Sequence, residues 1–150
     1  MRVGINFLVS SIDDLQKIRQ LAFNGNANAQ FTLGVCYMNG RFIVQDNVEA
    51  AKWFRKAAEQ GQVNAQNNLG VSYDRGCGVP QNFNEAVKWL RKAAEQGLPE
   101  AQFALGEHYA FGKGVTKCID TAEYWYKKAA AQGLSQAHIR LSHIYEGMIF

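Results

Sequence analysis

Histidine and cysteine are the residues of this 150-residue chain best suited to catalysis or metal binding. They are His108, His138, His143, Cys36, Cys77 and Cys118. A zinc site on one helix needs two histidines four residues apart, so that both rings lie on the same face. The pair at 138 and 143 is five apart, so the two rings point to different faces. We therefore expect no metal site.

A cysteine–histidine nucleophile is the other chemistry open to these residues. It requires hydrogen-bond contact between the thiol and the imidazole, and a third group that orients the imidazole. His108 occupies the same place as Cys36 in the repeat described below, but two repeats further along the chain. No orienting group is visible, so we expect no catalytic residue and no cofactor. A hydrolase that acts on cell-wall material or a β-lactam stays open as an alternative function.

The cysteines also bear on the compartment. They fall at three different places in the repeat, whereas a disulfide framework would recur in register, so we interpret them as free thiols of a reducing compartment. The apolar run 3–9 is short for a signal-peptide core, and Asp13 and Asp14 follow it instead of a cleavage site. We predict a cytoplasmic protein without a membrane partner. A periplasmic or secreted protein, with its signal peptide removed, is the alternative.

Basic residues recur in short runs that could contact an anion. The runs are Lys52/Arg55/Lys56, Lys88/Arg91/Lys92 and Lys127/Lys128. Glutamates lie nearby at helical spacing, as with Glu85 before Lys88, and the net charge is only +3. We interpret the runs as a solvated helix face and predict no nucleic-acid partner. The glycine-rich loop that starts at Gly76 lacks the Lys-Ser/Thr pair of a phosphate-binding loop, so it is a turn.

All of these residues lie within a repeated element. Residues 64–99, shifted back by 36 positions, match 28–63 at 20 of 36 places, and shifted forward they match 100–135 at the key places. A period of this size indicates stacked helix pairs. We predict an all-α fold in which residues 1–150 form one solenoid domain, a right-handed α-α superhelix of antiparallel helix pairs. Its parts are the half-repeat 1–27, the repeats 28–63, 64–99 and 100–135, and the half-repeat 136–150.

Each repeat is expected to contain two helices, A and B. The first helix A, residues 29–38, carries an apolar stripe in which Ala29, Leu33 and Tyr37 lie four residues apart. Gly34 lies beside the stripe, and glycine recurs at this place although it costs about 1 kcal/mol within a helix. We therefore expect a close approach of helices A and B. Phe42 stands where the later loops have glycine, so we expect a differently shaped first turn.

The B helices are expected at about 47–60, 84–96 and 120–132. A further helix is expected over 11–24 and a last helix A over 136–150, while residues 1–10 form an arm over the first helix. The predicted N-caps are Ser11 or Asp13, Asp46, Asn82 or Asn84, and Asp120. Tryptophan recurs at one place in helix B, as Trp53, Trp89 and Trp125, and supplies much of the buried area.

These repeats resemble the Sel-one-like repeat (SLR) family, a relative of the tetratricopeptide repeats. The resemblance rests on A-x-x-x-L-G-x-x-Y, then G-x-G-V, then E-A-x-x-W-x-x-K-A-A-E-Q-G, and it covers about the whole chain. It implies a non-catalytic adaptor or scaffold in protein–protein interaction, in a family with many bacterial members and no shared catalytic residues. It also implies that the A helices line the concave face of the superhelix.

The helix-A positions that point away from the apolar stripe are the predicted partner-binding groove, because they vary between the copies while the stripe does not. They are Asn28, Phe31, Val35, Asn39, Asn64, Asn67, Val71, Arg75, Phe103, Glu107, Phe111, Ile139 and His143. We expect another protein or a peptide to bind there. For Phe31 and Phe103, packing between adjacent A helices is equally open. A self-assembling scaffold, with a homo-oligomer formed through the terminal helices, is an alternative.

The predicted packing can be tested at Trp89, which lies in the middle repeat. Replacement by alanine removes a large buried side chain, so Trp89→Ala should lower the free energy of unfolding by roughly 3–5 kcal/mol. Urea denaturation of both proteins measures the difference. An unchanged unfolding free energy would mean that this side chain is not in the interior.

Overall fold

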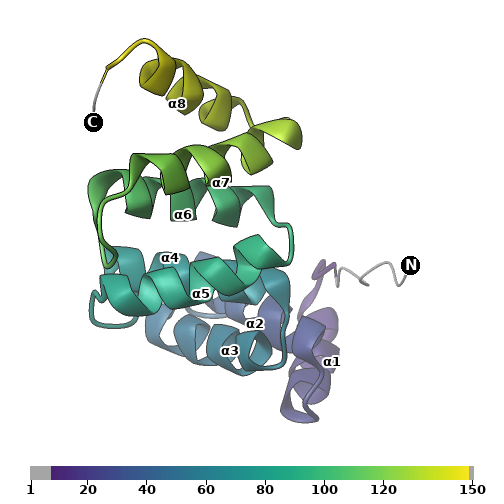
Figure 1. The fold of residues 1–150 in the computed structure, drawn as a ribbon. Helices are drawn as coiled ribbons and strands as arrows, with labels where there is room; N and C mark the ends of the chain where they lie inside the picture. The colour runs from purple at the N-terminus through teal and green to yellow at the C-terminus, as the bar shows by residue number, and fades with distance from the viewer. Residues whose placement is uncertain (1–7, 149–150) are drawn as a thin grey trace. The chain divides into compact units, whose positions relative to one another are not determined.

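The structure, a computed structural model, describes residues 8–148, and within them all regular secondary structure is α-helical. The chain divides into two compact units, Met1–Gln81 (unit 1) and Asn82–Phe150 (unit 2). Unit 1 contains α1 (Ile12–Phe23), α2 (Ala27–Asn39), α3 (Asn47–Glu59) and α4 (Val63–Arg75) (Figure 1). Unit 2 contains α5 (Phe83–Glu95), α6 (Pro99–Phe111), α7 (Ile119–Ala131) and α8 (Ser135–Tyr145). The predicted all-α class is confirmed.

Within each unit, every helix packs on the next one in the chain, and short loops make neighbours antiparallel (Figure 1). The α2/α3 and α6/α7 pairs are complete pairs of helices A and B. The expected helix bounds agree with the structure to within two residues, except at the last helix. That helix ends at Tyr145 because Gly147, in a left-handed conformation at φ 70°, terminates it. Residues 149 and 150, also predicted as helical, lie outside the described residues.

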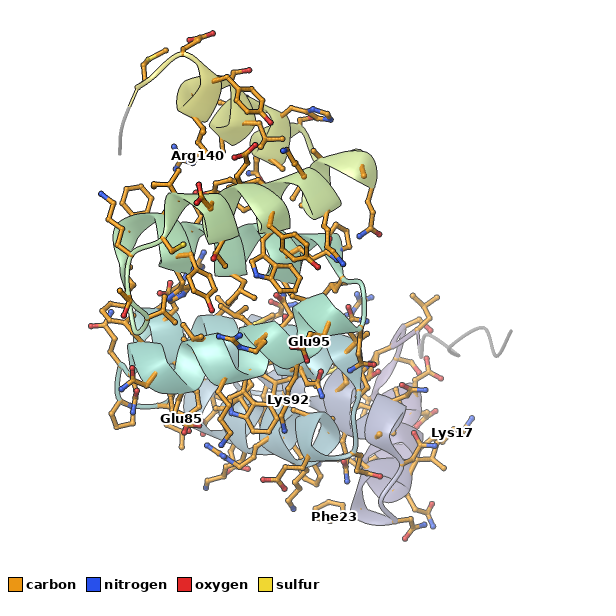
Figure 2. All side chains as sticks on the ribbon, in the orientation of Figure 1. Lys17, Phe23, Glu85, Lys92, Glu95 and Arg140 are labelled. Atoms are coloured by element: carbon orange, nitrogen blue, oxygen red, sulfur yellow. The ribbon has the colours of Figure 1, made fainter. Side chains whose placement is uncertain are left out.

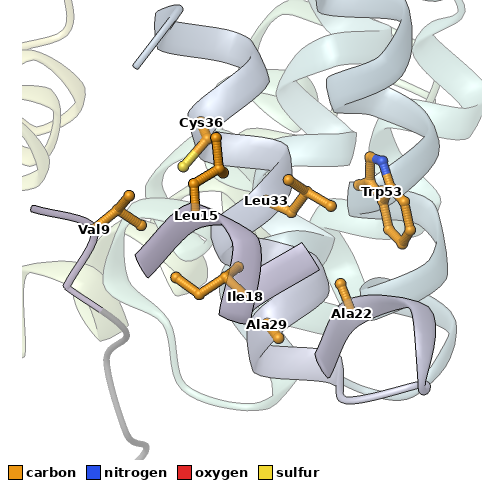
Figure 3. Packing of buried hydrophobic residues seen from close by; sticks show 8 residues of the cluster. All are labelled: Val9, Leu15, Ile18, Ala22, Ala29, Leu33, Cys36 and Trp53. Carbon is orange, nitrogen blue, oxygen red and sulfur yellow. The ribbon is translucent and has the colours of Figure 1, made fainter. Parts of the chain in front are cut away.

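The core of unit 1 combines small and large apolar residues from α1, α2 and α3 (Figure 3). Leu15 and Ile18 of α1 pack with Leu33 of α2 and with Trp53 of α3. Val9, from the arm before α1, is only 5% exposed and belongs to the same cluster, as expected for an arm that covers the first helix. The three repeat tryptophans are all buried, as predicted.

Glycine lets helix A approach the large side chain that helix B presents. A Cβ atom added to Gly34 would lie 2.6 Å from the Cε1 atom of Phe54, which is closer than carbon atoms can approach. The same holds in unit 2, where a Cβ on Gly106 would lie 2.6 Å from Cε1 of Tyr126. The expected close approach of helices A and B is therefore confirmed in both units.

Buried glutamines connect the helices, which the sequence analysis did not anticipate. In unit 1, Gln30 Nε2 donates to the backbone oxygen of Ala22 over 3.1 Å. Gln60 Nε2 in turn donates to Gln30 Oε1 over 2.8 Å. Gln102 and Gln132 repeat this second bond in unit 2 over 3.0 Å. These amides add hydrogen bonds at the helix ends, as at the Ala22 oxygen, which also accepts from the N–H of Gly25.

The helix starts follow the register of the repeat. Ser11, Asp46 and Asn82 cap α1, α3 and α5, and each side-chain oxygen accepts from a backbone N–H of the first turn, as predicted. The prediction of Asp120 for α7 is wrong. The N-cap there is Cys118, 36 positions after Asn82, because packing fixes where the helix begins even though this residue is a poor cap.

The turn between α2 and α3 has the same shape as the turns that follow α4 and α6, contrary to expectation. Phe42 adopts φ 58°, in the left-handed region, where Gly78 and Gly114 have 75° and 68°. The glycine is required in the later turns for space as well as for conformation. A Cβ on Gly78 would lie 2.0 Å from the backbone oxygen of Asn47. Phe42 is 44% exposed, so the first turn has room for a side chain and only the conformational cost remains.

This difference predicts opposite effects of two substitutions. Phe42→Gly should raise the unfolding free energy by about 0.5–1 kcal/mol, because relief of left-handed strain exceeds the entropy that glycine adds to the unfolded chain. Gly78→Ala should lower it by more than about 2 kcal/mol, because the new methyl group collides with backbone. Urea denaturation followed by circular dichroism measures both. A less stable Phe42→Gly protein, or an unaffected Gly78→Ala protein, would contradict this account.

Candidate partner-binding surface on the A helices

The predicted groove positions of unit 1 all retain accessible surface. Asn39 and Arg75, at the C-terminal ends of α2 and α4, are exposed. The half-buried positions are Asn28, Phe31, Val35, Asn64, Asn67 and Val71. Arg75 forms no ion pair or hydrogen bond with the described part of the chain, so its guanidinium is available to a partner.

The two half-buried phenylalanines pack within their own repeats. The ring of Phe31 lies 5.9 Å from that of Phe54 on α3, and the ring of Phe103 lies 5.7 Å from that of Tyr126 on α7. These ring contacts are with helix B of the same repeat, whereas the alternative left open from the sequence was packing between adjacent A helices. Part of each ring stays accessible, so each can contribute an apolar edge to a binding surface.

Three positions of unit 1 have distinctive surroundings. Val35 and Asn39 line a small hollow of about 130 Å³ together with Leu8 and Val9 of the N-terminal arm. Asn67 occupies the place that Phe31 has in the preceding repeat. Its Oδ1 atom is buried without a hydrogen-bond partner in the described chain. The A helices of unit 1 therefore present a mainly polar face with one shallow apolar depression.

In unit 2, Glu107 is already engaged within the protein. Its carboxylate accepts two hydrogen bonds from Arg140 of α8, each 2.8 Å long, and a third from the hydroxyl of Tyr126 on α7. Burial, together with this hydrogen bond, raises the pKa of Tyr126, and the bond to Glu107 raises the pKa of Arg140. Bidentate pairing of this kind is strong and directional. Glu107 therefore holds α6, α7 and α8 together.

Phe111 is the most exposed aromatic side chain of α6. It is 42% exposed at the end of α6, and Lys113 Nζ lies 5.9 Å from the centre of its ring. The guanidinium carbon of Arg140, labelled in Figure 2, lies at the same distance. On α8, Ile139 is 55% exposed and His143 is half-buried. An exposed aromatic ring flanked by cations is well suited to a partner with apolar and acidic groups.

The histidines and cysteines with catalytic potential have different surroundings. His108 is buried, and its Nδ1 is 2.8 Å from the backbone oxygen of Lys113, so this bond orients the ring within its own loop. Burial raises the pKa of the Cys36 thiol, which is the opposite of what a nucleophile needs. Cys77 is exposed and Cys118 half-buried. Between residues 8 and 148 there is no group of three or more potential metal ligands.

Some of the recurring lysines lie in charge pairs, as predicted. The expected pair of Lys88 with Glu85 is present at 3.7 Å, and Lys52 pairs with Glu49 at 2.8 Å. Such exposed pairs solvate a helix face and contribute little to stability. The described helices include none with the length and apolar character needed to cross a bilayer.

Comparison with known proteins bears out the repeat. The model of the Sel1 repeat matches residues 27–62, 63–98 and 99–134. The structure of c5321, a protective antigen present in uropathogenic Escherichia coli strains and displaying an SLR fold, is similar with a TM-score of 0.89 and 40% identity. That match covers 91% of this chain, and the chain spans 29% of the length of the antigen.

Two other solved structures resemble this chain. A Sel1 repeat protein from Oxalobacter formigenes has a TM-score of 0.80 and 41% identity over 87% of this chain and 98% of that one. Cysteine rich protein B of Helicobacter pylori, at 22% identity, shares the fold with a TM-score of 0.67 over 85% of this chain and 96% of that one. Curated protein sequences gave no significant match. With three matched repeats and the fold of these solenoids, the chain belongs to the Sel1 repeat family.

Proposed function

We propose that this protein is a non-catalytic adaptor that binds another protein, or a peptide segment of one, through its A helices. Sel1 repeat proteins are generally protein-interaction scaffolds, which supports the broad class of function. The role of these particular helices rests on their own features. The alanines and leucines of the helix-A stripe are buried and constant between copies, whereas the predicted groove positions are accessible and differ from copy to copy.

The observation that carries the proposal is the exposure of two anchor side chains among these positions. Arg75 has no partner within the described chain, and Phe111 exposes its ring between two cations. Arginine and aromatic residues are the commonest energetic anchors of protein interfaces. Glu107 and Phe103, in contrast, serve packing, so the proposal does not depend on them.

The proposal is tested by identifying a partner and then measuring its affinity. Affinity purification with mass spectrometry names the candidate, and calorimetry with the two purified proteins gives the dissociation constant. Arg75→Glu and Phe111→Ala should each weaken binding by about tenfold or more, because each removes an interface anchor. Both side chains are exposed, so the variants should remain folded.

Tyr124→Ala provides the matched control, since Tyr124 is an exposed aromatic residue of helix α7 and not of an A helix. This variant should bind the partner like the original protein. The proposal fails if Arg75→Glu and Phe111→Ala both leave the affinity unchanged, or if the control weakens binding equally.

A further inference from the structure

The outward face of helix α3 in unit 1 contains a recess of about 730 Å³, which we call the α3 recess. Its walls include Phe23, Val48, Trp53, Lys56, Glu59 and Val79, from α1, α3 and the loop that follows α4. Sites that bind small molecules or single anchor side chains typically measure about 300–1,000 Å³. Most of its lining comes from helices of type B, Tyr37 of α2 also contributes, and none of the predicted groove positions lines it.

Phe23 is the first sign that the recess has a role beyond packing. Its ring is 73% exposed and meets Trp53 edge-on, with 5.2 Å between ring centres. The later repeats have Glu59, Glu95 and Ala131 at the same place. Figure 2 labels Phe23 at the end of α1, and Glu95 at the end of α5. Because the other copies fold without an aromatic residue here, repeat packing does not require one.

Val48 is likewise more apolar than the residues at the same place in the later repeats. It is 52% exposed in the first turn of α3, where the later B helices have Asn84 and Asp120. A β-branched apolar residue at an exposed helix start contributes neither a cap nor helix propensity. Two exposed apolar side chains thus border one recess, at places where the other repeats have mostly polar residues.

The charges around the recess favour an acidic occupant. Glu49 is paired with Lys52 at 2.8 Å, which leaves Glu59 as the free carboxylate of the lining. Lys56 Nζ lies 4.4 Å from the ring centre of Trp53, and no carboxylate of the described chain pairs with it. Arg55 donates only to the neutral hydroxyl of Tyr73. The recess therefore combines an aromatic wall with an excess of positive charge.

We propose that the α3 recess binds a peptide segment of a partner protein that carries a large apolar side chain beside carboxylates. The apolar side chain packs against Phe23 and Val48, and a carboxylate pairs with Lys56. This second surface is separate from the A-helix surface of the proposed adaptor function. The two can therefore be distinguished by substitution.

The test is fluorescence anisotropy with the full chain and a fluorescein-labelled peptide of sequence Gly-Asp-Leu-Phe-Asp-Gly. A second peptide with both Asp replaced by Lys shows whether the carboxylates matter. The double variant Phe23→Glu/Val48→Asn places the residues of later repeats in the recess, so it should fold normally, and circular dichroism verifies this. It should weaken binding of the acidic peptide by at least about tenfold. Lys56→Gln should weaken binding by about threefold to tenfold, less so at high salt.

Two control variants leave the recess intact and should keep the original affinity. Val44→Asn changes an exposed valine of unit 1 that does not line the recess. Lys92→Gln removes the equivalent lysine over Trp89 in unit 2, where the Phe23 position is Glu95. A third variant, Phe111→Ala, changes the A-helix surface and shows whether the acidic peptide binds there instead of in the recess. The proposal is overturned if Phe23→Glu/Val48→Asn binds like the original protein, if the lysine peptide binds equally well, or if Phe111→Ala abolishes binding.

Discussion

The contact between a helix-A glycine and a large helix-B ring sets the geometry on which the rest of this structure depends. Gly34 faces Phe54, and Gly106 faces Tyr126, with no space for even one more carbon atom. This contact brings the two helices of a pair close enough for the alanine-rich stripes and the tryptophans to be buried on both sides. An isolated helix pair would leave those faces in water, so each pair needs its neighbours.

This constraint also separates the residues that must be kept from those that are free to differ. The stripe, the glycine and the tryptophan recur because packing fixes their size. Positions that face away from these contacts can change without cost, so an unusual residue there carries information. Phe23 and Val48 are examples, since their exposure and their difference from other copies cannot be explained by packing. Comparing the residues at one position in the different copies thus separates residues that serve packing from residues available for recognition.

Much of the fold could be predicted from the sequence, because the repeat shows the same packing problem three times. The errors arose where local propensity and register disagree: Asp120 is the better cap, but Cys118 holds the position that packing selects. Phe42 was expected to change a turn, yet its surroundings impose the left-handed conformation. The pairing of Glu107 with Arg140 could not be foreseen, because it joins residues 33 positions apart through the packing of α8.

The central claim, that the glycine–ring contact fixes the approach of each helix pair, is tested most directly by Gly106→Ala. In an ordinary exposed helix, replacing glycine by alanine raises stability by about 1 kcal/mol. Here the new methyl group would collide with the buried ring of Tyr126, so urea denaturation should show a net loss of about 1–2 kcal/mol, since overpacking costs more than propensity returns. An equal or higher free energy of unfolding for Gly106→Ala would contradict the account.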